Sequence, residues 1–349
     1  MQTALRWLSH GLIAGVLACG AATSGGEDDG DGGPGGGEAS NSSGGSGSSS
    51  GSLWLTTSVT IIVEPSDDAD ALVSAIQGAK TSVHVEMYLL SSDRVIDALI
   101  AQHKAGHDVK VLLNKTFPSS GDDSGSNSYV YAELQANGVD THWAPSGYTY
   151  THEKGVIIDG AVAWIMTMNA TESSPTANRE YLAVDTDADD IAEAEAIFEA
   201  DWADRSLVPS GKLVVSPTNS NAKLLALLAL ATKTIDMEAE ELTDSRIVDA
   251  LEASAKKGVA VHVVLADASS TSSAAALAAA GVKLVTYSAL YVHAKSIVVD
   301  GAYAYVGSEN FSDGSLESNR ELGVLTGAAA AVAAVESTTS SDFAAGTAL

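Results

Sequence analysis

The 349-residue chain has a single cysteine, Cys19, and this scarcity excludes two kinds of stabilising bond. With no second cysteine, no disulfide forms within the chain, and a zinc site built on cysteine ligands is excluded as well. Basic residues are also scarce, since 18 Lys and Arg stand against 45 Asp and Glu, for a formal net charge of −27. A surface this acidic repels polyanions, so nucleic acid is not an expected partner.

The N-terminal apolar run is too short to span a bilayer permanently, and it predicts a secretory signal peptide over residues 1–18. Arg6 precedes the run, which ends at Cys19. The residues Val16-Leu17-Ala18-Cys19 resemble the lipobox of bacterial lipoproteins, which implies cleavage before the cysteine and lipidation of that cysteine. An ordinary signal peptide followed by a free or buried thiol is the alternative.

Residues 20–52 are dominated by Gly, Ser and Asp and have no apolar periodicity, so they bury too little surface to offset chain entropy. We therefore expect residues 19–52 to form a lipidated cysteine followed by a Gly/Ser-rich tether. The protein is then expected to be secreted across the inner membrane and held as a lipoprotein at the bacterial cell envelope. The tether would keep the anchored protein free to reorient at the membrane.

The body of the chain contains an internal repeat. Residues 83–113 and 235–265 correspond at a constant spacing of 152. Each copy predicts a strand, an amphipathic helix, a turn and a second strand, because β-branched runs flank a segment with helical periodicity. The turn residues Gly106 and Gly258 keep the same spacing and stand where a helix would end.

A second repeated segment carries chemically active side chains. His152-x-Lys154 matches His293-x-Lys295 at a spacing of 141, and the spacing holds for a following Asp, an Asn and an Asn-Arg-Glu triplet. The fall from 152 to 141 assigns 11 additional residues to the first copy, most of them in the Ser-, Gly- and Asp-rich loop 118–128. We predict two similar α/β lobes. The predicted lobes span residues 53–210 and 211–349.

Each copy offers the groups that phosphodiester chemistry needs. A neutral imidazole can attack phosphorus and form a covalent intermediate. A Lys on the same strand face and a nearby Asn supply positive charge and donors to the non-bridging phosphate oxygens. A Glu that accepts a hydrogen bond from the other imidazole nitrogen fixes the tautomer. One copy provides a nucleophile but no acid for the leaving group, whereas two copies that face each other provide both.

These motifs resemble the histidine-lysine-aspartate signature of the phospholipase D superfamily, which continues into Gly-Ser-x-Asn. The second copy matches in full, while the first has Met166 and Thr167 in place of the Gly and Ser. Met166 is expected to crowd the phosphate pocket. The catalytic residues that the resemblance implies are His152, Lys154, Asn169, Glu180, His293, Lys295, Ser308, Asn310 and Glu321. The residues that support the motif are Asp159, Thr167, Asp300 and Gly307. The two Asp residues are expected to stabilise the motif turn.

The resemblance also implies a fold and a mechanism. Each lobe is expected to be a mixed sheet flanked by helices, with one active site at the lobe interface. One histidine becomes a phosphohistidine and the other protonates the departing alcohol, without a metal or another cofactor. We assign His152 as nucleophile and His293 as acid, although the near-symmetry of the motifs leaves the reverse order open. A monomer is expected.

We predict a phospholipase D-type hydrolase that cleaves phospholipid headgroup phosphodiesters. The alternatives within the superfamily are a nuclease, which the acidic composition disfavours, and a phosphatidyl-transferase such as cardiolipin synthase. A lipid-binding lipoprotein that lost turnover through Met166 is the alternative outside enzymes. In the loop 118–128, Asp122 and Asp123 suit a cationic headgroup such as choline or ethanolamine.

Two further features have simpler interpretations. The Asn-Arg-Glu triplets at 178–180 and 319–321 are also compatible with surface ion pairs. Glu240 and Glu241 are expected to belong to a solvated turn.

Overall fold

The computed structural model describes residues 53–118 and 126–349. The predicted signal peptide, the tether with Cys19, and the loop residues Asp122 and Asp123 lie outside this described part. Within it, no helix combines the length and the apolarity that a membrane span requires. The described residues all belong to one compact unit.

The first lobe is a mixed sheet covered by helices on both faces. Its strands are β1 (Val59–Glu64), β2 (Ser82–Met87), β3 (Asp108–Leu113), β4 (Asp140–Trp143), β5 (Lys154–Ile158), β6 (Val162–Met166) and β7 (Asn178–Asp185). Its helices are α1 (Asp70–Gln77), α2 (Asp93–Lys104), α3 (Ser128–Ala136), α4 (Ser174–Ala177) and α5 (Ala188–Trp202). The strand order is β1-β7-β6-β5-β2-β3-β4. Strands β2, β3 and β4 run parallel, and β5 pairs antiparallel with β2.

The second lobe repeats this arrangement. Its strands are β8 (Val214–Ser216), β9 (Thr234–Ala239), β10 (Ala260–Leu265), β11 (Lys283–Thr286), β12 (Tyr291–Val292), β13 (Lys295–Val299), β14 (Tyr303–Gly307), β15 (Glu321–Thr326) and β16 (Thr347–Ala348). Its helices are α6 (Ser220–Leu228), α7 (Ser245–Lys256), η2 (Ala268–Ser270), α8 (Ala274–Ala280), α9 (Asp313–Glu317) and α10 (Ala329–Ala345). The strand order is β16-β11-β10-β9-β13-β14-β15-β8.

The repeat in the sequence is a repeat in the structure. The bounds of β2, α2 and β3 differ from those of β9, α7 and β10 by 152 residues in every case. Gly106 and Gly258 have φ values of 92° and 93°, a left-handed conformation that glycine adopts without strain. Apart from the additional edge strand β16, the two sheets have the same strand order. The predicted fold of two mixed-sheet α/β lobes is therefore confirmed.

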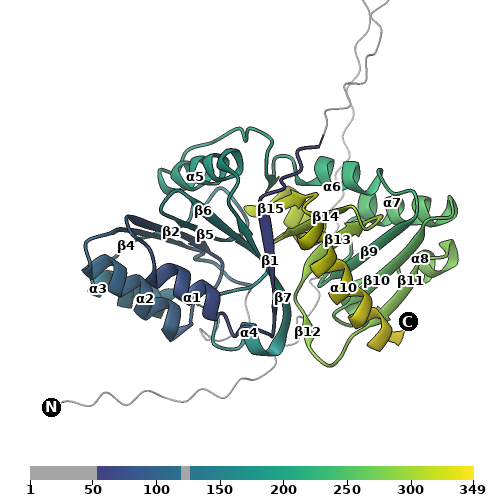
Figure 1. Cartoon of the computed structure of the whole chain (residues 1–349), viewed down its shortest axis with the longest axis horizontal. Helices are drawn as coiled ribbons and strands as arrows, with labels where there is room; N and C mark the ends of the chain where they lie inside the picture. Colours follow the sequence, from purple (N-terminus) through teal and green to yellow (C-terminus); the bar gives the residue numbers. More distant parts are fainter. Residues whose placement is uncertain (1–52, 119–125) are drawn as a thin grey trace, which may run out of the picture. The chain divides into compact units, whose positions relative to one another are not determined.

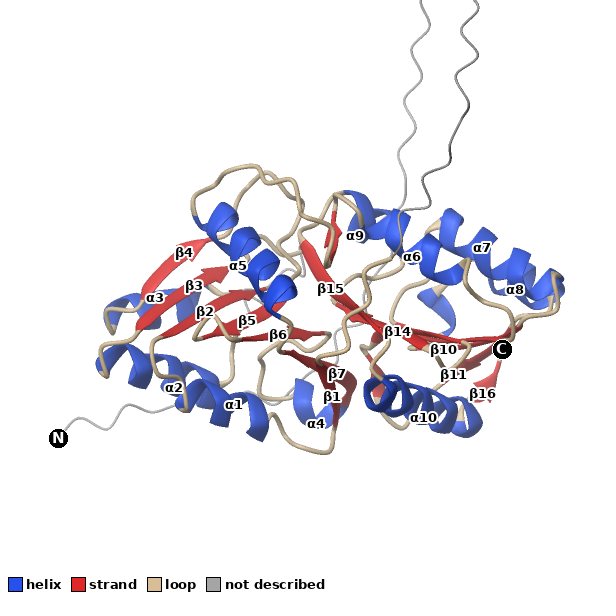
Figure 2. Ribbon diagram, turned by 45° about the horizontal axis from the view of Figure 1, so that its top comes forward, coloured by secondary structure: helices blue, strands red, loops and turns tan. Residues whose placement is uncertain are grey.

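Strand alternation gives each sheet an outer and an inner core. Val83 and Val85 of β2 pack in a core with residues of α1, α2 and α3, and Ile235 and Met237 of β9 pack in an equivalent core with α6, α7 and α8. The opposite faces are covered by α5 in the first lobe and α10 in the second (Figures 1 and 2). The core on these inner faces contains residues of both lobes, so burial of apolar surface holds the lobes together.

Candidate active site

The chain crosses between the lobes just before each motif histidine. Strand β12 pairs in parallel with the start of β7, in the first lobe. In the equivalent place Thr151 forms a parallel bridge with Arg320, at the start of β15. The backbone N–H of His152 then donates to the carbonyl oxygen of Arg320 at 2.8 Å. This pairing sets each histidine beside the Asn-Arg-Glu triplet of the other lobe.

Each histidine is bonded to a glutamate of the opposite lobe. Nδ1 of His152 lies 2.8 Å from Oε2 of Glu321. Nδ1 of His293 lies 2.8 Å from Oε1 and 2.9 Å from Oε2 of Glu180. Because a carboxylate accepts hydrogen bonds, Nδ1 is the donor in both pairs, and Nε2 is the nitrogen left for attack or proton transfer. The structure thus joins four of the predicted catalytic residues in pairs that neither lobe can form alone.

The two glutamates are themselves held in place. The donors are Thr167 and Asn178 to Glu180, and Ser315 and Asn319 to Glu321. Burial is the largest influence and raises the pKa of each glutamate, but the histidine partner, a nearby lysine and the hydrogen-bond donors together hold the net pKa below the usual range. Both glutamates therefore stay anionic and can stabilise an imidazolium. Thr167, which replaces the Ser of the motif, acts on Glu180.

Lys154 and Lys295 are the buried cations of the site. Nζ of Lys154 donates to the carbonyl oxygen of His152 at 2.5 Å, and Nζ of Lys295 donates to that of His293 at 2.6 Å. Burial lowers the pKa of Lys154 to about 7. A lysine has three N–H donors, so each ammonium can also reach a phosphate oxygen. In the described part of the chain, no group of three or more His, Cys, Asp and Glu side chains is arranged to hold a metal.

The side-chain oxygens of Asn169 and Asn310 lack hydrogen-bond partners among the described residues, whereas the hydroxyl of Ser308 has one. The Oδ1 atoms of both asparagines are buried and have no hydrogen-bond partner among the described residues. Such an oxygen can accept a hydrogen bond from a hydroxyl of a ligand, while the Nδ2–H groups of the same amides are the donors for a phosphate oxygen. Oγ of Ser308, in contrast, accepts a hydrogen bond from the backbone of Leu322 at 3.1 Å. Ser308 therefore braces the sheet.

Asp159 and Asp300 lie in turns at the far ends of the motif strands β5 and β13. Both have positive φ, 56° and 55°. Their carboxylates accept hydrogen bonds from three consecutive backbone N–H groups each, at residues 80–82 and 232–234. Although burial opposes the shift, these bonds lower the pKa of Asp159 to about 2. The two residues tie turns together and do not contact the histidines.

The expectation that Met166 crowds the phosphate pocket is wrong. Met166 is fully buried in the hydrophobic core of the first lobe, where its strand partner is Leu182. The equivalent pair in the second lobe is Gly307 and Gly323, and a Cβ on Gly307 would lie 2.6 Å from Cα of Gly323. Tyr305 fills the space beside these glycines. The motif glycine is thus required by packing within the second sheet, and the first sheet packs larger residues instead.

The arginines of the triplets clamp the lobes together, so the interpretation as surface ion pairs is wrong. Nε of Arg179 lies 2.6 Å from Oδ2 of Asp342 on α10, and Nε of Arg320 lies 2.6 Å from Oδ2 of Asp201 on α5. Each arginine makes a second bond of 3.1 Å to the same carboxylate. The side chains of Arg320 and Asp201 are only 3% and 1% exposed. Each pair joins one lobe to the last helix of the other.

The family described as "Cardiolipin synthase, PLD-like domain" matches residues 72–202 and 224–343, one match in each lobe. The chain belongs to this family. Each match contains one of the two His-x-Lys sequences and one Asn-Arg-Glu triplet. The PLD-like domain that the resemblance implies is therefore confirmed.

The similar curated proteins include several cardiolipin synthases. That of Oceanobacillus iheyensis is 25% identical over 312 residues, which cover 76% of this chain and 64% of the relative. Cardiolipin synthase 1 of Bacillus anthracis is 24% identical over 327 residues, which cover 76% and 62%. The chain therefore spans less than two thirds of the length of these relatives.

Two solved structures share the fold of the PLD-like lobes. The phosphatidylserine synthase of Haemophilus influenzae Rd KW20 matches with a TM-score of 0.65 and 12% identity, over 85% of this chain and 89% of the other. The polyphosphate kinase of Porphyromonas gingivalis matches with a TM-score of 0.60 and 13% identity, over 76% and 47%. At these identities the likeness shows the fold alone.

Glu240 is part of the PLD-like site, so its interpretation as a solvated turn residue is wrong. Oε2 of Glu240 accepts a hydrogen bond from Nζ of Lys295 at 2.6 Å and lies 3.7 Å from Nε2 of His293. The repeat contains the signal that identifies it. Glu240 follows Tyr88 by 152 residues, and the ring of Tyr88 packs against His152 with centroids 4.5 Å apart.

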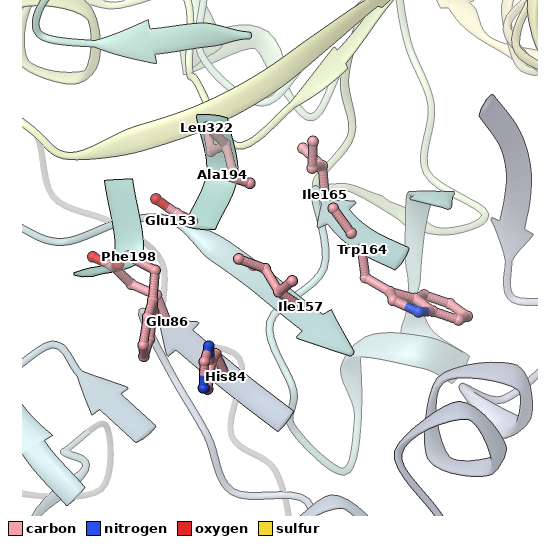
Figure 3. Close-up of a pocket in the computed structure, with 11 residues that line it drawn as sticks. His84, Glu86, Glu153, Ile157, Trp164, Ile165, Ala194, Phe198 and Leu322 are labelled. Atoms are coloured by element: carbon pink, nitrogen blue, oxygen red, sulfur yellow. The ribbon is translucent and has the colours of Figure 1, made fainter. Parts of the chain in front are cut away.

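A cavity of about 10 Å³ adjoins the first motif (Figure 3). Glu86 and Glu153 line it together with apolar residues such as Phe198. Burial raises the pKa of Glu153 to about 8 and that of Glu86 well above its usual range, so burial favours the protonated form of both carboxyls. The volume is close to the smallest that holds one water molecule. This cavity is too small for a substrate and lies among the buried residues that pack next to the first motif.

The pKa values of the first motif predict a pH optimum for the free enzyme. Burial lowers the pKa of His152 to about 4, so its imidazole is neutral and able to attack above that pH. Lys154, with a pKa of about 7, loses its charge as the pH rises further. We expect kcat/KM on a soluble phosphodiester to rise through pH 4 and to fall above pH 7, by about tenfold per pH unit.

Lys154→Arg tests the alkaline limb of this profile. A guanidinium stays charged at every pH in the range, so the limb that Lys154 causes should move to higher pH. If the alkaline limb is identical in wild type and Lys154→Arg, a group other than Lys154 causes it.

Proposed function

We propose that the chain transfers a phosphatidyl group from a phospholipid to an alcohol through a phosphohistidine. The observation that carries the proposal is the pair of histidine–glutamate contacts across the lobe interface. They orient two imidazoles in one site, and each histidine is followed two residues later by a buried lysine. A nucleophile and an acid are both needed to displace an alkoxide from a phosphodiester, and this site supplies both.

The reaction proceeds in two displacements. In the first, Nε2 of one histidine bonds to phosphorus, the P–O bond to the leaving alcohol breaks, and the other histidine gives its Nε2 proton to that oxygen. In the second, an acceptor hydroxyl gives its proton back to the second histidine and its oxygen bonds to phosphorus as the P–N bond breaks. Lys154 and Lys295, together with the Nδ2–H groups of Asn169 and Asn310, would donate hydrogen bonds to the non-bridging oxygens in both steps.

The acceptor is an alcohol rather than water in this proposal, which favours the phosphatidyl-transferase alternative over the hydrolysis expected from the sequence. The support comes from the relatives, since proteins similar over 76% of the chain are cardiolipin synthases. Cardiolipin consists of two phosphatidyl groups joined through one glycerol. In its synthesis the acceptor of the phosphatidyl group is therefore the hydroxyl of a lipid. A lipid anchor at Cys19, as the sequence predicts, would keep the site at a surface where such hydroxyls are concentrated and water competes less.

Vesicles of phosphatidylglycerol separate transfer from hydrolysis, because the two reactions give different lipids. Transfer to a second phosphatidylglycerol yields cardiolipin and glycerol, whereas hydrolysis yields phosphatidic acid and glycerol. We expect cardiolipin to exceed phosphatidic acid when the lipids are quantified by mass spectrometry. Phosphatidic acid alone would support a phospholipase D instead, and cleavage of DNA without any lipid product would support a nuclease.

Matched histidine variants show whether the products come from this site. His152→Ala should abolish both lipid products. His142→Ala should retain them, since the side chain of His142 is 47% exposed and lies outside the site.

The lysines also predict resistance to chelators. Lys154 and Lys295 already place positive charge at the phosphate oxygens, the role that a metal ion plays in other phosphoryl-transfer sites. We expect EDTA to change the rate of lipid conversion by less than about twofold. A loss of activity in EDTA that a divalent cation restores would contradict the proposed roles of the lysines.

A further inference from the structure

The two halves of the site differ at one pair of repeat positions. Tyr88 directly follows β2 and Glu240 directly follows β9. Tyr88 sets an aromatic ring against His152 at an interplanar angle of 68°. Glu240 sets a carboxylate oxygen 3.7 Å from Nε2 of His293. An uncharged ring therefore faces one histidine, while an anion faces the other.

Glu240 faces the nitrogen through which His293 reacts. Nδ1 of His293 is occupied by Glu180, so a proton is given or taken at Nε2. An anion at this distance favours the imidazolium, and the attraction is strengthened because the Glu240 side chain is only 18% exposed. The ring of His293 thus has a carboxylate at each nitrogen, whereas in the described part of the chain His152 has one, Glu321.

The two lysines also differ in their carboxylate partners, because among the described residues the ammonium of Lys295 is bonded to a carboxylate and that of Lys154 is not. Nζ of Lys295 donates to Glu240 and to the carbonyl oxygen of His293, which uses two of its three donors. Nζ of Lys154 donates to the carbonyl oxygen of His152 and otherwise lies 5.1 Å from the centroid of the Tyr88 ring. The ammonium of Lys154 has no carboxylate bonded to it among the described contacts. While Lys154 is protonated, an anionic phosphodiester is therefore attracted more strongly to the half of the site that contains His152.

Tyr291 fixes the position of the Glu240 carboxylate. Its hydroxyl donates to Oε1 of Glu240 at 2.8 Å, while Oε2 accepts from Lys295. With both oxygens engaged, the carboxylate is held beside His293. Burial raises the pKa of Glu240, but Lys295, His293 and His152 together outweigh burial and hold it below the usual range, so the carboxylate is charged when it faces His293.

We propose that Glu240 is a positioning residue that makes His293 the acid of the site and leaves His152 as the nucleophile. Glu240 acts through His293 and Lys295. In the first displacement the imidazolium of His293 gives its Nε2 proton to the leaving oxygen while Nε2 of His152 bonds to phosphorus. In the second, His293 takes the proton of the acceptor hydroxyl. This inference rests on the proposed phosphohistidine function and decides which histidine has which role.

The test compares two diesters that differ in their need for an acid. Phosphatidylglycerol expels an alkoxide that must be protonated, whereas a p-nitrophenyl phosphodiester expels a stabilised phenolate. Glu240→Gln keeps the size of the side chain and removes its charge. We expect this variant to lower kcat on phosphatidylglycerol by about tenfold or more, a part of what acid–base assistance supplies. The single-turnover rate of p-nitrophenolate release, which reports the first displacement alone, should fall by less than about twofold. Glu240→Asp should recover part of the loss.

Glu241→Gln is the matched control, because its carboxyl bonds Ser312 and not the histidine. Thermal unfolding of each variant checks that the fold is intact. A loss in Glu240→Gln that is equal on both diesters, or absent on both, would overturn the inference.

Mapping the covalent intermediate on the unaltered chain gives a second test that needs no variant. The wild-type protein is mixed with the p-nitrophenyl diester and quenched in base, and its peptides are analysed by mass spectrometry. The phosphoryl group is expected on His152. A phosphoryl group on His293 would overturn the inference while supporting the proposed function. Failure of the wild-type chain to turn over either diester would count against the proposed function itself.

Discussion

Alanine at either His152 or His293 is expected to lower kcat by at least about 100-fold, the lower end of what acid–base assistance alone supplies. His152→Ala removes the atom that bonds to phosphorus, and His293→Ala leaves an alkoxide without a proton donor. The two losses are not expected to add, because the imidazoles act as one unit, so the double variant should be about as slow as either single variant.

The two single variants should nevertheless differ in what accumulates. With a p-nitrophenyl diester, His293→Ala can still form the phosphohistidine but lacks the base for the second displacement, so the intermediate is expected to build up. His152→Ala should form none. The control is His142→Ala, which should behave as wild type. Retention of more than about a tenth of wild-type kcat in either site variant would contradict a single shared site.

The sequence predicted the fold well because the repeat recorded it twice. A strand, a helix and a strand at a constant spacing of 152 residues specify one supersecondary unit, and the structure places both copies with identical bounds. The pattern could not show how the copies contact each other. Repeated residues are equivalent, but equivalence does not say whether His152 pairs with Glu180 or with Glu321. The strand pairing between β12 and β7 decides this, and that contact spans the two lobes.

The errors at Met166 and Glu240 have physical reasons. The motif predicts a place beside the phosphate for Met166, but its position is set by the packing of neighbouring strands, which differs between the lobes. Glu240 follows a buried strand, where an acidic residue usually reaches solvent. Its register with Tyr88 was present in the sequence, but only the structure shows that this register leads to the reactive nitrogen of His293.

Replacing Arg320 with alanine is expected to destabilise the fold by about 3–5 kcal/mol, the usual cost of removing one partner of a buried ion pair. Arg320 is bonded twice to Asp201, donates to the carbonyl oxygen of Ser216 at 3.0 Å, and contacts the hydroxyl of Tyr148. Without the guanidinium, the Asp201 carboxylate would be left buried near Glu86 without its positive partner. Because Arg320 and Asp201 belong to different lobes, the destabilisation would affect the lobe interface.

Arg94→Ala is the matched control for this variant. Arg94 also bonds two carboxylates, those of Asp68 and Asp70, but its side chain is 41% exposed and theirs are 60% and 69% exposed. An exposed pair of this kind contributes less than about 1 kcal/mol. Unfolding in urea, followed by circular dichroism, should therefore separate the two variants clearly. Equal midpoints for Arg320→Ala and Arg94→Ala would show that the clamp adds no more than a surface pair. The larger loss would show that the strand carrying Glu321 is held in place by the same residue that locks the lobes together, so that stability and the orientation of His152 depend on one contact.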